Sequence, residues 1–218
     1  MKAISLLSGG LDSVVATWAA RADCQIAAAL TADYGQRAAP NEIAAAGQVA
    51  AKLGCPHIVV DLRWLGALGQ NALTDPTLAV PEPGAASLDD RDVTEQTAAA
   101  VWVPNRNGVL LNVAAAHAEA LGCQSIICGF NIEEAATFPD NSREFMAAMD
   151  ASLAFSTRTQ VRVLSPTASL TKREIVALAR RIGAPLEDVW SCYHSGEAQC
   201  GKCESCLRLG RALAEPET

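Results

Sequence analysis

The sequence predicts an α/β protein in which a Rossmann-like parallel sheet carries helices on both faces. Short apolar runs alternate along the chain with stretches whose apolar residues recur at helical spacing. Such alternation favours parallel strands joined by crossover helices, because each helix can cover one face of the sheet. The length of 218 residues and the 50% hydrophobic content suit one such domain with a small appendage.

The first predicted strand, over 2–7, is apolar almost throughout and runs into two glycines, as expected for a buried parallel strand. A helix is predicted over 11–22, where apolar residues recur at helical spacing. Gly54 marks the end of a second helix and Thr171 the cap of the last. The other elements continue the alternation, with strands over 25–31, 57–61, 125–128 and 161–164, and helices over 41–53, 105–121, 142–155 and 171–182.

Residues 70–101 break this rhythm. Pro76, Pro81, Pro83 and Gly84 cluster there, with aspartates close behind. We interpret the segment as a long loop or insertion that could act as a mobile lid. The α/β domain is therefore predicted over 1–183, and a small C-terminal helical region over 184–218.

The overall charge and the lack of targeting signals narrow the class of protein. The formal net charge is −7, which disfavours general nucleic-acid binding, since phosphate neutralisation needs clustered basic residues. A local basic pocket for a nucleotide stays open. The apolar stretches are too short for a membrane span, and the first residues do not form a secretory signal. We therefore expect a cytoplasmic protein without a membrane partner.

A glycine-rich turn joins the first predicted strand to the first helix. Leu7 precedes Ser8, Gly9, Gly10, Leu11, Asp12 and Ser13. Glycines let the backbone approach a phosphate closely, and the free amides of the helix N-terminus favour an anion. The hydroxyl groups of the two serines add donors, and the aspartate could orient the loop or contact a magnesium ion that bridges phosphates. The alternative is a structural turn with a serine cap.

Four cysteines, Cys192, Cys200, Cys203 and Cys206, crowd the C-terminal region. In a reducing compartment such a cluster indicates a metal more often than disulfides. Four sulfur ligands at short spacings suit a tetrahedral zinc ion, with an iron–sulfur cluster as the chemical rival. A site saturated by four thiolates leaves no open position, so we expect a structural zinc.

The glycine-rich string resembles the pyrophosphate loop of the N-type ATP pyrophosphatases, whose fold is of the adenine nucleotide alpha hydrolase type. Together with the cysteine spacing, it resembles the 7-cyano-7-deazaguanine synthase family over nearly the whole chain. Four weaker similarities support this: Leu30 to Arg37, Val103 to Asn107 (with Asn105 where the family has glycine), Phe138 to Asp140, and Ser165 to Thr167 followed by Lys172 and Glu174.

The resemblance implies an ATP-dependent ligase that adenylates 7-carboxy-7-deazaguanine and converts it with ammonia, through the amide, into the nitrile, releasing AMP and pyrophosphate. It implies ATP, Mg²⁺ and Zn²⁺ as cofactors and a homodimer as the assembly. The resemblance assigns catalytic roles to Asp12, Ser13, Lys172 and Arg37. ATP binding falls on residues 7–13, Tyr34 and Arg106, and binding of the deazapurine carboxylate on Asn107, Glu133, Glu134, Phe138 and Asp140.

One departure from the family pattern lies near the expected acceptor site. The family commonly continues Y-P-D-C-R, whereas Asn141 and Ser142 follow Asp140 here. A homologue that stops at the amide, or that joins the activated carboxylate to another amine or a protein, is therefore an alternative. A tRNA thiolase-type pyrophosphatase is disfavoured by the acidic charge, and a nucleotide-binding zinc module acting in regulation is the non-enzymatic alternative.

Overall fold

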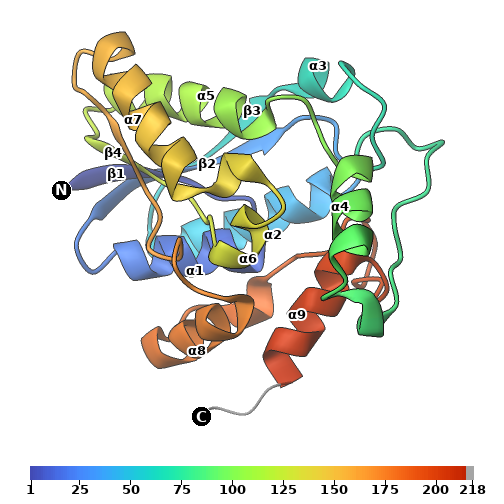
Figure 1. Ribbon diagram of the computed structural model, residues 1–218. Coiled ribbons are helices and arrows are strands. Elements are labelled where there is room, and N and C mark those ends of the chain that lie inside the picture. Colours follow the sequence, from blue (N-terminus) through green and yellow to red (C-terminus); the bar gives the residue numbers. More distant parts are fainter. Residues whose placement is uncertain (215–218) are drawn as a thin grey trace.

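The computed structural model describes residues 1–214, so the last four residues of the predicted C-terminal region, 215–218, lie outside the described part. Its centre is a parallel five-stranded sheet with the strand order β3-β2-β1-β4-β5 (Figure 1). The strands are β1 (Lys2–Leu6), β2 (Gln25–Asp33), β3 (His57–Asp61), β4 (Ser125–Ile127) and β5 (Arg162–Leu164). The chain moves outward from β1 to β3 and then returns to the other side of β1. The carboxyl ends of β1 and β4 therefore form the switch point of the sheet.

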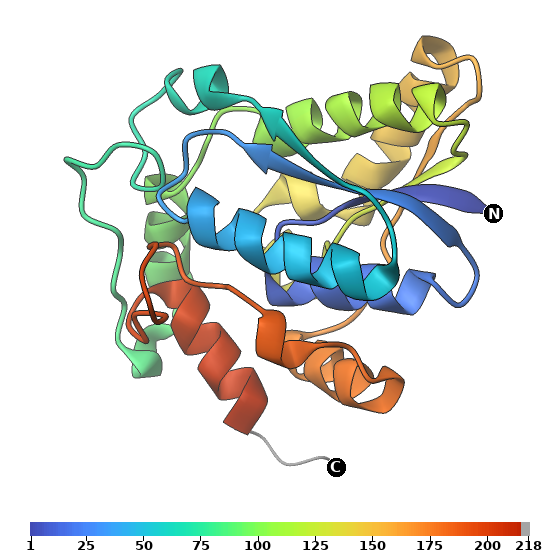
Figure 2. The ribbon, with the colours of Figure 1, turned by 180° about the vertical axis from the view of Figure 1, so that it is seen from behind.

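Helices cover both faces of this sheet, as Figures 1 and 2 show, and this confirms the predicted fold class. On one face lie α5 (Arg106–Ala120) and α7 (Arg143–Ser156), and on the other lie α1 (Leu11–Ala20), α2 (Ala39–Leu53) and α8 (Lys172–Ile182). Neighbouring residues of β2 illustrate the arrangement. Leu30 packs in the core that includes α5 and α7, whereas Ala29 packs in the core that includes α1, α2 and α8.

The helix ends agree with the sequence signals. Gly54 takes a left-handed conformation with φ 68° and ends α2. Thr171 caps α8, because its hydroxyl oxygen accepts a bond from the Glu174 amide. The Glu174 carboxylate accepts a bond from the Thr171 amide, which completes a capping box. The predicted strands and helices that these signals delimit match the structure to within about two residues at each end.

Residues 70–101 contain more structure than the expected loop. A short 3₁₀ helix covers Ala85–Ser87, and α4 covers Arg91–Ala100. The side chain of Asp90 caps α4 by accepting bonds from Asp92 N at 3.0 Å and Val93 N at 3.3 Å. The acidic run that we interpreted as loop is therefore in part a helix start. Four other short elements were not predicted: α3 (Arg63–Gly66), α6 (Ile132–Ala135), and 3₁₀ helices over Pro139–Asn141 and Leu186–Asp188.

The C-terminal region forms α9 (Glu204–Ala214), which lies beside α4 in both views (Figures 1 and 2). Arg211 forms an ion pair with Asp89 at 2.8 Å, just before α4. Ala212 is buried in the same core as α8. The tail thus packs against the α/β domain. Within residues 1–214, no helix combines the length and the apolar content that a membrane crossing requires.

The core face of α7 allows a direct stability test. Leu153 is 1% exposed, whereas Phe155, two residues later, is 95% exposed. We expect Leu153→Ala to lower the free energy of unfolding by about 2–5 kcal/mol, because it leaves a cavity in a packed core. Phe155→Ala is the matched control and should change it by less than about 0.5 kcal/mol. Urea denaturation measures both, and equal losses would contradict this account of the core.

Candidate active site and metal centre

The glycine-rich loop lies at the switch point between β1 and β4, where open α/β sheets bind ligands. Gly9 has φ 81°, and a Cβ there would lie 2.8 Å from the carbonyl oxygen of Glu42. Gly129 follows β4, and a Cβ there would lie 2.4 Å from the amide nitrogen of Ser13. Glycine is therefore required on both sides of the loop, because any side chain would displace it.

Hydrogen bonds within the loop hold its two serines together. The Ser8 amide donates to Ser13 Oγ at 3.2 Å, and the two hydroxyl oxygens are 3.0 Å apart. Ser13 Oγ also donates to the carbonyl oxygen of Gly10 at 3.0 Å. Gly10 is the N-cap of α1 and supplies no side-chain cap. The first amides of α1 therefore remain open to an anion, as phosphate binding requires.

A cavity of about 280 Å³ opens in front of this loop. It brings together most of the predicted site residues: Leu7, Ser8, Gly10, Leu11, Asp12, Ser13, Tyr34, Arg106, Asn107, Glu134, Phe138 and Lys172. Gly9, Arg37, Glu133 and Asp140 do not line it. Residues far apart in the sequence thus share one pocket.

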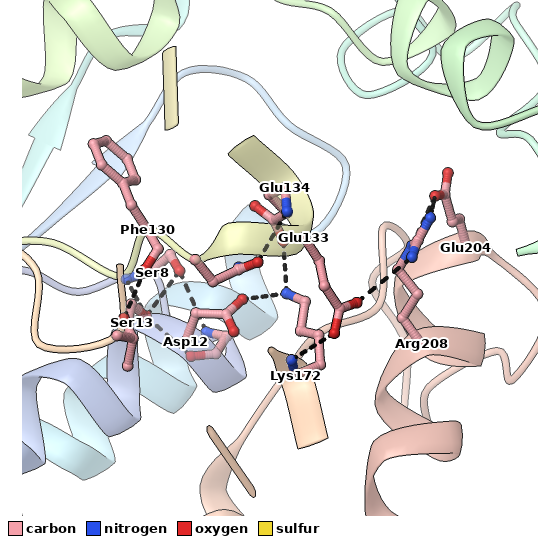
Figure 3. Close-up of polar contacts among 12 residues, drawn as sticks. Ser8, Asp12, Ser13, Phe130, Glu133, Glu134, Lys172, Glu204 and Arg208 are labelled. Atoms are coloured by element: carbon pink, nitrogen blue, oxygen red, sulfur yellow. Dashed lines mark hydrogen bonds and ion pairs between the residues drawn. The ribbon is translucent and has the colours of Figure 1, made fainter. Parts of the chain in front are cut away.

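An ion-paired cluster at the loop centres on Lys172 (Figure 3). Its ammonium group contacts the Asp12 carboxylate and lies 2.6 Å from Glu134 Oε1. Burial opposes the charge of Lys172, but the two carboxylates outweigh it and raise the pKa of Lys172 above its ordinary value. Burial raises the pKa of Asp12 to about 6, with Lys172 acting in the opposite direction. Lys172 is therefore a permanent cation beside the glycine-rich loop, residues 8–13.

One oxygen of the Asp12 carboxylate is available to coordinate a metal ion. Its Oδ2 contacts Lys172, whereas its buried Oδ1 has no hydrogen-bond partner among the described residues. An unpaired buried carboxylate oxygen is costly unless a ligand or ion satisfies it. Oxygen ligands of this kind suit Mg²⁺, so the residues present fit a magnesium ion at this point.

The far wall of the cavity carries the predicted nucleotide- and substrate-binding groups. Arg106 Cζ lies 6.0 Å from the centroid of the Tyr34 ring, and Arg106 Nε donates to Asn107 Oδ1 at 3.2 Å. Asn107 Nδ2 donates in turn to the carbonyl oxygen of Asp140 at 3.2 Å. Asn105 has φ 52°. It stands where the resembled family has glycine because asparagine also tolerates this left-handed conformation.

Three predicted residues outside the cavity have other neighbours. Arg37 Nη2 donates to the carbonyl oxygens of Asp75, at 2.5 Å, and Leu78, so the structure does not bring it to the phosphate loop. Glu133 accepts a bond from the Lys172 amide at 2.7 Å. Asp140 lies behind the wall, and burial raises the pKa of its carboxyl group. Of the three, Glu133 is the one that contacts Lys172.

Sequence reasoning missed several cavity residues. Glu42 comes from α2, and Glu204 and Arg208 come from α9. Neither a motif nor helical periodicity distinguishes them from surface charges. Only Gly129, a glycine directly after a predicted strand, carried a usable signal.

Glu42 is a buried acid in this cavity. Its Oε2 accepts a hydrogen bond from Gln36 Nε2 at 2.7 Å. Burial raises the pKa of its carboxyl group from 4.5 to about 7. The group therefore changes its charge close to neutral pH.

The four predicted cysteine ligands form a compact cluster, with their sulfur atoms within 4.8 Å of one another. Backbone amides of His194 and Cys200 donate to Cys192 Sγ at 3.4 Å. Gly201 has φ 70°, which forms the tight turn between Cys200 and Cys203. Four converging thiols with amide donors fit a tetrahedral zinc ion that serves structure.

The protonation of Glu42 gives a test with a definite sign. Between pH 4.5 and 7 the native protein holds a proton that the unfolded chain has lost, so the free energy of unfolding falls as pH rises. We expect the stability gain of Glu42→Gln over the parent to grow across this window, by on the order of 1–3 kcal/mol. Denaturation at several pH values measures the effect.

Glu187→Gln is the matched control for this experiment. Its partner Lys52 lowers the pKa of the exposed Glu187 carboxyl group, so this acid contributes stability at neutral pH that is lost in acid. The variant should therefore lose stability relative to the parent as pH rises. Parallel pH curves for Glu42→Gln and the parent would contradict the assigned protonation.

Comparison with known proteins agrees with this geometry. The family model described as queuosine biosynthesis protein QueC matches residues 2–217. A 7-cyano-7-deazaguanine synthase of Desulforudis audaxviator (strain MP104C) is 54% identical over 212 residues, which cover 97% of this chain and 96% of that protein. The 7-cyano-7-deazaguanine synthase of Methanosarcina mazei is 48% identical over 216 residues, covering 98% and 94%.

A solved NH3-dependent NAD synthetase from Campylobacter jejuni is a more distant likeness. It is 16% identical with a TM-score of 0.44, and the match covers 86% of this chain and 66% of that one. The family match and the two synthases extend over nearly the whole chain, including the loop, the cavity and the cysteine cluster. The chain therefore belongs to the family of the queuosine biosynthesis protein QueC, and it is an enzyme.

Proposed function

We propose that this enzyme uses ATP to convert 7-carboxy-7-deazaguanine and ammonia into 7-cyano-7-deazaguanine, releasing AMP and pyrophosphate. The observation that carries the proposal is the loop of Ser8 to Ser13, with open amides of α1 and the Lys172 ammonium group facing one cavity. The names of the close relatives support the product.

The first chemical step overcomes the poor leaving group of a carboxylate. A carboxylate oxygen of the substrate attacks the α-phosphorus of ATP, and pyrophosphate leaves toward the loop. The amides of α1 and the Lys172 ammonium group stabilise the charge that develops on the departing phosphates. Asp12 Oδ1 would hold Mg²⁺, which neutralises phosphate charge when bound.

Ammonia then attacks the activated carbonyl carbon, AMP leaves with one substrate oxygen, and a proton is released, giving the amide. In a second cycle the amide oxygen attacks a new ATP, pyrophosphate leaves, and loss of AMP and of both protons on the amide nitrogen gives the nitrile. Each AMP thus carries away one oxygen of the original carboxylate. No covalent bond to the protein is needed, so the chain contributes binding, orientation and charge.

The wall opposite the loop suits a deazapurine. Phe138 stacks on Trp102 with ring centroids 6.2 Å apart, and Arg106 and Asn107 present a guanidinium and an amide group. We propose Asn107, Glu134 and Phe138 for the base, with two supporting groups outside the cavity, Glu133 at the Lys172 amide and Asp140 behind the wall. We do not include Arg37 among the phosphate ligands, because its guanidinium group is held by the 75–78 segment.

The cysteine cluster would hold zinc as a structural ion, and a reducing compartment such as the cytoplasm would keep its thiols available. We also propose a homodimer, as the family resemblance implies. These assignments add no chemical step to the reaction.

A second candidate function is an enzyme that stops at the amide. It is favoured by Asn141, which lines the cavity where the family commonly has cysteine. The same activated carboxylate would then react with ammonia once, and no second ATP would be consumed. The ratio of AMP to product separates the two reactions.

The proposed reaction is tested with purified zinc-loaded enzyme, ATP, Mg²⁺, ammonium and 7-carboxy-7-deazaguanine. We expect the nitrile by mass spectrometry, with two AMP formed for each product molecule. One AMP for each amide would support the second candidate instead. Neither product with folded enzyme would refute both.

Asp12→Asn tests the loop. Loss of the charge that pairs with Lys172 and would bind Mg²⁺ should lower the rate of pyrophosphate release by about a hundredfold or more. Asp61→Asn is the control, since Asp61 pairs with Arg63 on the exposed surface. Full activity of Asp12→Asn in a pyrophosphate-release assay would refute the role of this residue.

A further inference from the structure

We propose that Arg208, on the helix that carries Cys206, is a positioning residue for Lys172 and acts through Glu133. The proposal rests on the proposed function for its kinetic consequence but not for its structural one. It links the metal-bearing tail to the phosphate loop, two parts of the chain that lie at opposite ends of the sequence.

The cysteine cluster includes a residue of α9. Cys206 lies in the first turn of α9 and shares the cluster with Cys192, Cys200 and Cys203. Arg208 follows two residues later. Its Nη2 forms an ion pair with Glu204 at 2.7 Å and donates to the carbonyl oxygen of Leu88 at 3.2 Å. The Arg208 side chain is 17% exposed. A metal bound by the cluster would thus hold the helix that aims this guanidinium group.

Arg208 faces Glu133 with its second amino group (Figure 3). Arg208 Nη1 lies 3.8 Å from Glu133 Oε2, and Glu133 Oε1 accepts the bond from the Lys172 amide at 2.7 Å. Lys172 is the first residue of α8, so its amide has no acceptor within the helix. The Glu133 carboxylate supplies that acceptor and also suits the positive end of the helix dipole. Glu133 therefore bridges α9 and the start of α8.

Lys172 carries this link into the active cavity. Its ammonium group contacts both Asp12 of the phosphate loop and Glu134. Four carboxylates, Asp12, Glu133, Glu134 and Glu204, thus surround two cations, Lys172 and Arg208. Without Arg208, the charge of Glu133 would be less well compensated beside Glu134. Repulsion between these neighbours would then move the carboxylate that anchors the Lys172 backbone.

The test compares Arg208→Ala and Arg208→Lys with Arg211→Ala, a control on the same helix whose arginine pairs with the exposed Asp89. The first measurement is hydrogen exchange of the Lys172 amide in zinc-loaded enzyme without substrates. We expect exchange to rise about tenfold in Arg208→Ala and to remain unchanged in Arg211→Ala, because only the first loses the cation beside Glu133.

The second measurement separates positioning from binding. We expect kcat of Arg208→Ala to fall by about tenfold to a hundredfold, with the KM for ATP within about threefold of the parent. Arg208→Lys, which keeps a cation beside Glu133, should recover part of the lost kcat. If Arg208→Ala loses zinc, Arg208→Gln takes its place in both measurements, because it also removes the cation beside Glu133.

Two results would overturn the proposal. One is unchanged exchange at Lys172 in zinc-loaded enzyme whose Arg208 has been replaced by an uncharged residue. The other is a KM for ATP that rises as much as kcat falls, since Arg208 would then bind the nucleotide directly. Failure of the proposed function would differ from both, because the parent enzyme itself would form no product while the exchange comparison would still report on the link.

Discussion

The Lys172 ammonium group, shared between Asp12 and Glu134, is the interaction on which the site depends. It joins the loop after β1, the short helix α6 after β4, and the start of α8. Removing such a buried cation would leave two neighbouring carboxylates uncompensated. The same group gives the glycine-rich loop a fixed positive charge, so the arrangement that holds three elements together also makes the cavity favourable for an anion.

The parallel sheet explains why these elements meet. The reversal of strand order at β1 places the loop and the start of α6 at one carboxyl edge. Gly129 allows the segment after β4 to approach the loop, because no side chain separates it from the Ser13 amide. Backbone shape therefore forms the side of the cavity at the glycine-rich loop, whereas side chains of α5 and the residues before it form the opposite wall.

Local signals explain what the sequence could predict. Apolar runs, Gly54 and the capping box at Thr171 define elements through neighbouring residues, and the phosphate loop is likewise contiguous. The helix α4 was missed because prolines before it dominated the pattern, although Asp90 is its cap. Glu42 and Arg208 reach the cavity only through packing of α2 and α9. Arg37, by contrast, was predicted in the site, but nearby carbonyl oxygens hold it outside the cavity.

A hydrogen bond between the glycine-rich loop and the segment before the cysteine cluster affects the order in which the enzyme folds during synthesis. The amide of Trp190, just before the first clustered cysteine, donates to the carbonyl oxygen of Gly9 at 2.9 Å. During synthesis the loop emerges from the ribosome first and must wait for the tail before this bond can form. A nascent chain can thus build its sheet early, yet it completes the glycine-rich loop only after Trp190 has been translated.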